Sequence, residues 1–324
     1  MEIIGGVSRW ELTVRREADH IVILRAATPD EKAVLPEELF GLPVTVLGDH
    51  ALAPKAKPTE GERVRIIRGG ECIEPDNSRL KELTLPRLLE RVEDYALLNC
   101  RSLTTLHLWD GVRFWGGGAL MNCSALNRFF LTRTEPLQGP SLALFADESA
   151  NELDVTVREY DGSMTRLIFP DFVESYEENG PAHHFDYKIY GAGHPYHHVF
   201  RQKQFAFADY DNLWPQYLRE EYEADAALRL AWYRLRYPTG LSEAAAARYW
   251  GYLREHAGEI LRRQLEDRDP EGLELLLKTL RPSGNVLGEI LEQTRRLDYA
   301  EGMALLLREN GQTAPKGYEK SFDL

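Results

Sequence analysis

The chain has 324 residues, 43% of them hydrophobic, which is enough for about two ordinary domains. Its 39 basic and 52 acidic residues give a net charge of −13, which disfavours nucleic acid and anionic membranes as partners. The N-terminal residues do not form a basic segment followed by an apolar one, and no run of about 18 apolar residues occurs. We therefore expect a cytoplasmic protein with neither a secretion signal nor a membrane span.

The cysteines are Cys72, Cys100 and Cys123, an odd number without a CxxC motif. A disulfide framework or a cysteine zinc site is therefore not expected, and reduced thiols fit better.

The first predicted element is a β-hairpin. The stretch WELTVRREADHIVILRAA, which begins at Trp10, alternates apolar and polar residues on both sides of a polar turn. We expect this hairpin to cap the edge of the structure that follows.

A 23-residue repeat comes next. Leu80, Leu103 and Leu126 recur at this constant spacing, and each of the first two opens an LxxLxL pattern. A period in the twenties with LxxLxL is typical of leucine-rich repeats, in which each coil contributes a short strand and a return segment. One coil cannot bury its own apolar face, so the coils must stack.

An Asn-Cys pair closes both complete copies, at Asn99-Cys100 and Asn122-Cys123. These side chains are small and weakly polar, so we expect both to sit inside the corner of each coil and to contact bent backbone. The interpretation is structural, because no second metal ligand or catalytic partner lies nearby.

The pattern LxxLxLPxxxxxVxxxAxxxCxxL resembles the BspA-like class of bacterial leucine-rich repeats. LPEELFGLPVTVLGDHALA resembles the opening coil of such arrays, which places the array at about residues 35–132. Residues 53–77 are expected to form a divergent or inserted coil. The sequence departs from the pattern at Trp109, Trp115 and the glycines 116–118, so we expect the second coil to bulge there.

Residues 133–212 lose the 23-residue rhythm and are predicted to be rich in β-structure. ELDVTVREYDGSMTRLIFPDF alternates around Asp161-Gly162, which predicts strands near 152–160 and 164–169 joined by a type I′ turn. HFDYKIYG and HHVFRQKQFAF also have strand-like spacing.

The same segment contains five histidines, His183, His184, His194, His197 and His198. A metal site would require His183, His194 and His198 to converge with a carboxylate such as Asp186 or Asp209. The spacing matches no zinc signature, and adjacent histidines in a strand face opposite sides. The alternatives are a ligand-binding surface that includes His194, Tyr196 and His197, and ordinary loop histidines.

Residues 213–324 are predicted to be helical, with Ser242 as the N-cap of one helix. Gly258-Glu-Ile-Leu recurs at Gly288-Glu-Ile-Leu, and PEGLELLLK recurs at the same offset as AEGMALLLR. The array resembles ankyrin-type helical hairpins, although the TPLH motif of that family is missing. Five aromatic residues are candidates for binding a partner, although their helical spacing also suits a core: Trp214, Tyr217, Trp232, Tyr233 and Trp250.

The predicted fold class is α+β, with a leucine-rich-repeat solenoid and its hairpin cap (1–132), a β-rich segment (133–212) and α-helical repeats (213–324). No phosphate-binding loop, GxSxG or HExxH motif occurs, so no enzyme activity and no cofactor are predicted. The predicted function is a non-enzymatic, intracellular bacterial scaffold for an unknown protein partner. One alternative is a metal-binding protein or enzyme that uses residues 183–198. Another is a secreted adhesin, as many BspA-like proteins are. The helical repeats could also merely cap the solenoid.

Overall fold

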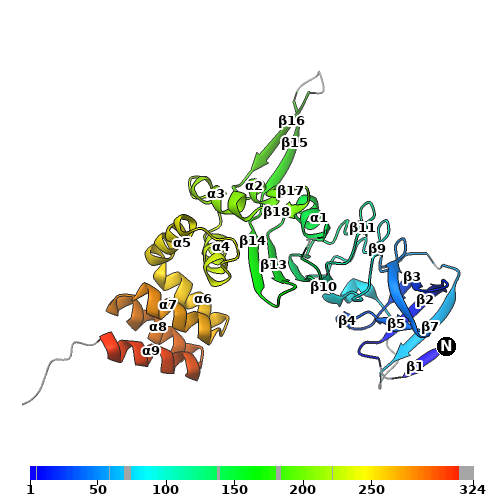
Figure 1. The fold of residues 1–324 in the computed structure, drawn as a ribbon, viewed down its shortest axis with the longest axis horizontal. Coiled ribbons are helices and arrows are strands. Elements are labelled where there is room, and N and C mark those ends of the chain that lie inside the picture. The colour runs from blue at the N-terminus through cyan, green and yellow to red at the C-terminus, as the bar shows by residue number, and fades with distance from the viewer. Residues whose placement is uncertain are drawn as a thin grey trace, which may run out of the picture. The chain divides into compact units, whose positions relative to one another are not determined.

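The computed structural model describes residues 1–4, 6–57, 59–68, 74–136, 139–179, 184–220 and 222–313 (Figure 1). The chain forms two compact units, Met1–Glu223 and Ala224–Leu324. The first contains two large β-sheets and the second contains helices, so the predicted α+β class is confirmed. The three-domain division at residues 132 and 212 stays a prediction. Among the described residues, no helix has the length and apolar character needed to cross a membrane.

The first sheet joins the N-terminal hairpin to one side of the solenoid. The predicted hairpin is formed by β2 (Trp10–Arg16) and β3 (Ile21–Ala27), and β3 runs parallel to β6 (Leu42–Leu47). The sheet order is β1-β7-β2-β3-β6-β9-β11, with β5 paired to β6. The remaining strands are β1 (Glu2–Ile4), β5 (Glu38–Leu39), β7 (Glu62–Ile67), β9 (Arg91–Val92) and β11 (Phe114–Trp115).

The prediction of a divergent or inserted coil at residues 53–77 is wrong in part: the segment is an insertion, but it does not form a coil of the solenoid. Within this segment β7 leaves the solenoid and pairs antiparallel with β2 and parallel with β1. Val64 and Ile66 of β7 are buried, while Arg63 and Arg65, which alternate with them, are exposed. This period of two suits a sheet with one face in water. The coil before the segment stacks directly on the coil after it, because β6 pairs with β9 and the Leu52 amide donates to the Ala96 carbonyl. Cys72 lies outside the described residues.

The second sheet carries the repeat. Parallel pairing runs through β4 (Lys32–Val34), β8 (Glu82–Thr84), β10 (Thr105–Trp109), β12 (Arg128–Thr132) and β13 (Leu153–Arg158), and β14 (Met164–Phe169) closes it antiparallel. Leu83 pairs with Leu106 and Leu106 with Phe129, each one repeat further along the chain, and all three are buried. The predicted period and β-solenoid are therefore confirmed.

Of the two residues in each Asn-Cys pair, the cysteine lies inside the corner of the coil as expected, and the asparagine does not. Cys100 and Cys123 are buried, and their thiols donate to the carbonyls of Leu52 and Leu97, at 3.5 and 3.2 Å. Asn99 and Asn122 are exposed instead of buried, and each has a φ of 62°. Asparagine tolerates this left-handed conformation better than most residues. The side-chain amide of Asn122 also donates to Asn99 Oδ1 at 2.9 Å, so the two asparagine side chains form a ladder on the surface.

The expected bulge at the glycines is absent, because Phe114 and Trp115 keep the 23-residue register with Arg91 and Val92. A Cβ atom on Gly116 would lie 2.4 Å from the main-chain nitrogen of Asp94. Glycine there lets the two coils approach closely.

The predicted strands on both sides of Asp161-Gly162 are confirmed as β13 and β14, but the type I′ turn is wrong. Gly162 has a φ of 86°, whereas Asp161 does not take a positive φ. The Asp161 carboxylate instead accepts a hydrogen bond from the Ser163 amide at 2.9 Å, which stabilises a longer loop. The rest of the first unit contains α1 (Ser141–Glu148), β15 (Val173–Asn179), β16 (His184–Tyr190), α2 (His194–His197), β17 (Phe200–Arg201), β18 (Gln204–Phe205) and α3 (Phe207–Tyr217).

The second unit consists of helical hairpins, as predicted. It contains α4 (Ala224–Arg236), α5 (Glu243–Glu255), α6 (Ala257–Glu266), α7 (Pro270–Leu280), α8 (Gly284–Arg296) and α9 (Ala300–Thr313). α6 packs on α8 and α7 on α9, so one hairpin stacks on the next. Arg268 and Asp298, at equivalent positions of successive hairpins, take the same left-handed conformation between their helices. Ser242 accepts from the Ala245 amide as the N-cap of α5.

Leu106 provides a test of the repeat register. Leu106→Asp would place a charge in the fully buried row of the second sheet, at a cost of about 4 kcal/mol or more, which is comparable to the whole stability of a small domain. We expect loss of cooperative unfolding of the first unit in denaturant titrations. Arg101→Asp, at an exposed site in the corner before β10, should change stability by less than about 0.5 kcal/mol. An unchanged midpoint for Leu106→Asp would mean that the register is wrong.

Asn99 provides a test of the corner conformation. Asn99→Ala should destabilise the protein by about 1 kcal/mol, because alanine is strained at positive φ, and Asn99→Gly should recover most of this loss. Asn127→Ala, at an exposed position without a positive φ, is the matched control. Equal midpoints for Asn99→Ala and the control in urea unfolding would contradict this account.

Candidate functional site

Most of the aromatic residues predicted to bind a partner lie in the protein core. The exposed fractions of Tyr196, Trp214, Tyr217, Trp232 and Tyr233 are at most 4%. Tyr196, for example, contacts the rings of Tyr210 and Tyr217, with centroid distances of 4.8 and 5.3 Å. Of the helical candidates, only Trp250 is partly accessible. A binding role for these residues stays a prediction, and their visible role is packing.

His197 joins two segments of the first unit. Its ring is buried, with Nδ1 2.8 Å from the Ala146 carbonyl oxygen at the end of α1 and Nε2 2.8 Å from the Pro170 carbonyl oxygen after β14. Burial lowers the pKa of His197, although the two carbonyl oxygens favour the charged ring and partly offset this effect. A neutral ring has one N–H and can donate to only one of the two carbonyls, and the visible role of His197 is structural.

His194 and His198 lie side by side, with their Nε2 atoms 3.0 Å apart. The Asp147 carboxylate is 3.8 Å from His198 Nδ1. Asp209 is paired with Arg201 instead, at 2.7 Å. Within the part of the chain that the structure describes, no three His, Cys, Asp or Glu side chains gather as a metal site would require. His183, the third histidine of the predicted alternative, lies outside the described residues.

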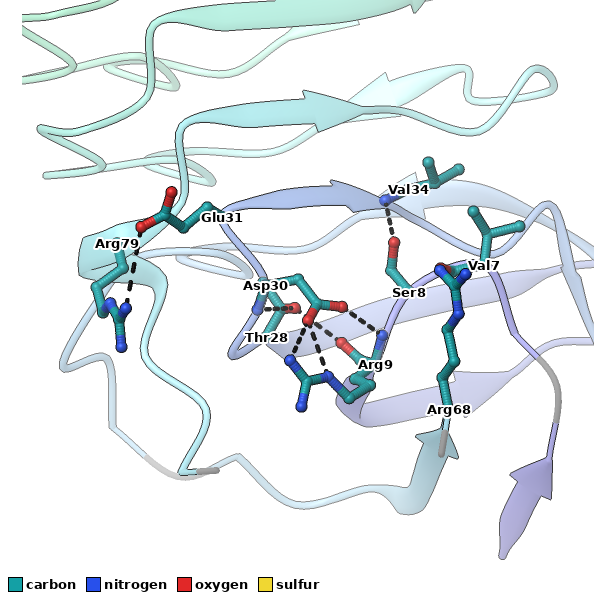
Figure 2. A network of polar contacts seen from close by, with 9 residues as sticks. All are labelled: Val7, Ser8, Arg9, Thr28, Asp30, Glu31, Val34, Arg68 and Arg79. Atoms are coloured by element: carbon teal, nitrogen blue, oxygen red, sulfur yellow. Dashed lines mark hydrogen bonds and ion pairs between the residues drawn. The ribbon is translucent and has the colours of Figure 1, made fainter. Parts of the chain in front are cut away.

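A polar pocket of about 600 Å³ lies at the N-terminal end of the first unit. Figure 2 shows its network: the Arg9 guanidinium pairs with Asp30, with Nε and Oδ1 2.8 Å apart, and Arg68 donates to the Val7 carbonyl at 2.7 Å. Arg79 lies 3.9 Å from Glu31. These cations already have acidic or carbonyl partners that belong to different segments. The network therefore clamps the hairpin to the first coil and does not offer free charge to a ligand.

The ribbon of β15 and β16 presents exposed aromatic side chains. It stands away from the two large sheets in Figure 1. Tyr176 and Tyr187 face each other across the strands with ring centroids 5.0 Å apart, and their exposed fractions are 71% and 48%. Val173 and Tyr190, the pair at the base of the ribbon, are also exposed. Sequence analysis recognised the strand-like spacing of β16 but missed β15, whose sequence VESYEEN does not alternate apolar and polar residues.

A cleft of about 470 Å³ opens between residues 118–126 and the end of α1. Its apolar wall includes Phe129 and Phe145, whose rings stack with centroids 4.3 Å apart. Glu148 at its rim is mainly exposed, but shielding from water and the adjacent Asp147 raise the pKa of its carboxyl. Burial raises the pKa of Cys123 to about 12, so this thiol is not a nucleophile at neutral pH.

The comparisons with known proteins identify no family. No family model matches the chain, and no curated protein matches it. A solved structure that matches is the crystal structure of the leucine rich repeat protein of T. pallidum, at 19% identity and a TM-score of 0.21, covering 37% of this chain and 68% of that chain. This is a weak likeness and implies nothing about function.

The depressed pKa of His197 predicts an acid sensitivity. The unfolded chain takes up a proton near the ordinary histidine pKa of 6.5, before the folded protein does, so the unfolded state binds more protons as the pH falls. The stability contributed by neutral His197 is complete above about pH 6.5 and is lost as the pH falls through the lowered pKa. His197→Gln should be less stable at pH 7.5 but should lose less stability between pH 7.5 and 5. Denaturant titrations at both pH values measure this, and equal losses in both proteins would contradict it.

Proposed function

We propose that this protein is a non-enzymatic scaffold that binds another protein through the aromatic ribbon of β15 and β16. The observation that carries the proposal is the exposure of Tyr176 and Tyr187, which pair across the strands. A two-stranded ribbon has too little structure to bury either face, and such ribbons are marginally stable in water. Large aromatic side chains left in water on such a ribbon are typical of a surface that a partner covers.

The chemistry of the ribbon favours a protein partner. The Tyr187 hydroxyl donates to the Glu174 carboxylate at 2.6 Å, and this bond raises the pKa of Tyr187 to about 12. The hydroxyl is thus fixed and neutral. Rigid tyrosines bury a large area at a low cost in side-chain entropy, as at the centres of many protein interfaces. The ribbon belongs to the same compact unit as the stacked solenoid, and this supports the scaffold role.

The finer assignments from the sequence also remain proposals. These are the BspA-like class, the ankyrin-like character of the helical hairpins, the bacterial origin and the cytoplasmic location. The alternative, a metal-binding protein or enzyme, is supported by the close approach of His194 and His198.

Removal of the two tyrosine rings tests the proposed function. We expect the Tyr176→Ser/Tyr187→Ser double variant to capture at least about tenfold less of a partner from lysate of the native host, because the centre of the interface is lost. Tyr160→Ser, at a loop position with an exposed fraction of 56%, is the matched control and should capture the partner normally.

Mass spectrometry identifies the captured proteins. The melting temperatures of the wild type, the control and the double variant should be equal, which shows that a loss of capture is not caused by unfolding. Partner capture that is the same in wild type, control and double variant would exclude the ribbon as the binding surface. Stoichiometric metal in the same purified sample would instead favour the metal-binding alternative.

A further inference from the structure

Each corner of the solenoid donates main-chain hydrogen bonds to the next corner of the stack. The donors alternate along the chain, and the acceptors are carbonyls at alternate residues. Tyr95, Leu97 and Asn99 donate to Gly117, Ala119 and Met121, at 3.1, 2.9 and 3.0 Å. One coil earlier, His50 and Leu52 donate to Asp94 and Ala96 in the same way, at 3.1 and 2.7 Å.

The last corner has the same donors but no next corner. By the 23-residue register, its donors are the main-chain N–H groups of Gly118, Leu120 and Asn122. After β12 the chain forms α1 in place of another corner. A helix uses its carbonyls internally except in its last turn, where the Ala146 carbonyl lies 2.8 Å from His197 Nδ1. Among the described residues, nothing accepts hydrogen bonds from these three N–H groups. All three residues border the cleft or are partly exposed beside it.

The opposite end of the stack is closed. The Arg25 guanidinium of β3 donates to the carbonyls of His50 and Ala53, and the Ala26 amide donates to the Ala51 carbonyl at 2.7 Å. The corner stack is therefore capped where it begins and open where it ends. An open row of main-chain groups is a template for another chain.

The lining of the cleft indicates what can fill it. The three free donors require acceptors, yet no Lys, Arg or His lines the cleft, and Glu148 places an acid at its rim. A phosphate or carboxylate would meet this acid without a compensating cation. Neutral main-chain carbonyls meet no such repulsion, and an apolar side chain can pack against Phe129 and Phe145.

We propose that the cleft binds a short segment of a partner protein. Its carbonyls, at alternate residues, accept hydrogen bonds from Gly118, Leu120 and Asn122, and a basic side chain faces Glu148. The segment takes the place of the missing corner. This surface is separate from the aromatic ribbon. If the ribbon proves not to bind a partner, that result says nothing about the cleft, which has its own test.

A peptide that copies this chain's own corner is a suitable probe. In the segment 94–101, DYALLNCR, the carbonyls of Asp94 and Ala96 already accept hydrogen bonds from the main chain of the preceding corner. We would titrate the full-length protein, labelled with ¹⁵N at glycine, leucine and asparagine, with the capped peptide carrying Cys100→Ser. Its Arg101 corresponds to Ser124 in the 23-residue register, and the chain after α1 contacts Ser124, so Arg101 supplies the basic side chain on the side of Glu148. We expect downfield shifts and slower hydrogen exchange of the Gly118, Leu120 and Asn122 amides. The same peptide carrying Arg101→Glu should bind more weakly.

Variants of the protein locate the binding. Ala150→Trp fills the cleft and should weaken binding by about tenfold or more, whereas Ala18→Trp, on the exposed β2–β3 turn, should not. If Ala150→Trp does not fold, Glu148→Arg replaces it, and this variant should now prefer the peptide that carries Arg101→Glu.

Three results would overturn the proposal. The first is that the three amides do not respond to millimolar peptide. The second is that inorganic phosphate produces the same shifts at lower concentration, which would make the cleft an anion site. The third is that the amides become protected as the protein concentration rises without peptide, which would make a second copy the occupant.

Discussion

The first unit depends on the stacking of coils that cannot fold alone. A single coil exposes one apolar row, and only the next coil, one repeat further along the chain, can cover it. The parallel pairing of Leu83, Leu106 and Phe129 aligns this row and leaves it without contact with water. Every other feature of the unit must keep this register. The left-handed asparagines at the corners, the close approach at Gly116 and the thiols turned towards backbone carbonyls all do so.

The two ends of the stack differ in how their main-chain hydrogen-bonding groups are paired. At the start, the hairpin of β2 and β3 continues the sheet, and Arg25 covers the free carbonyls of the first corner. The Arg9–Asp30 pair fixes this hairpin to the coil that follows. At the far end, α1 covers the apolar interior through Phe145, but among the described residues it accepts no hydrogen bond from the N–H groups of Gly118, Leu120 and Asn122. The helix closes the core and leaves the corner donors free, which is where we place a partner segment.

The surfaces proposed for binding share one physical origin. The ribbon has too few strands to bury Tyr176 and Tyr187, and the last corner lacks the layer that would use its N–H groups. On the ribbon, the local structure leaves aromatic rings in contact with water. At the last corner, it leaves main-chain N–H groups to which another chain could bind. Neither depends on the buried aromatic residues of α3 and α4, whose size suits the cores in which they lie.

The sequence by itself determined the elements that arise from short periods. The 23-residue spacing of leucines fixed the strands of the solenoid, the alternation near Trp10 and Asp161 fixed the hairpins, and the 30-residue spacing of Gly258 and Gly288 fixed the helical array. A period reports which side of an element is apolar, and this is a local property. Only the tertiary structure decided that residues 62–67 leave the solenoid, that Tyr196 and Trp214 are buried while Tyr176 is exposed, and that the last corner is open. Burial and hydrogen-bond partners also depend on segments distant in the chain, and spacing within one segment does not identify which distant segment will cover it.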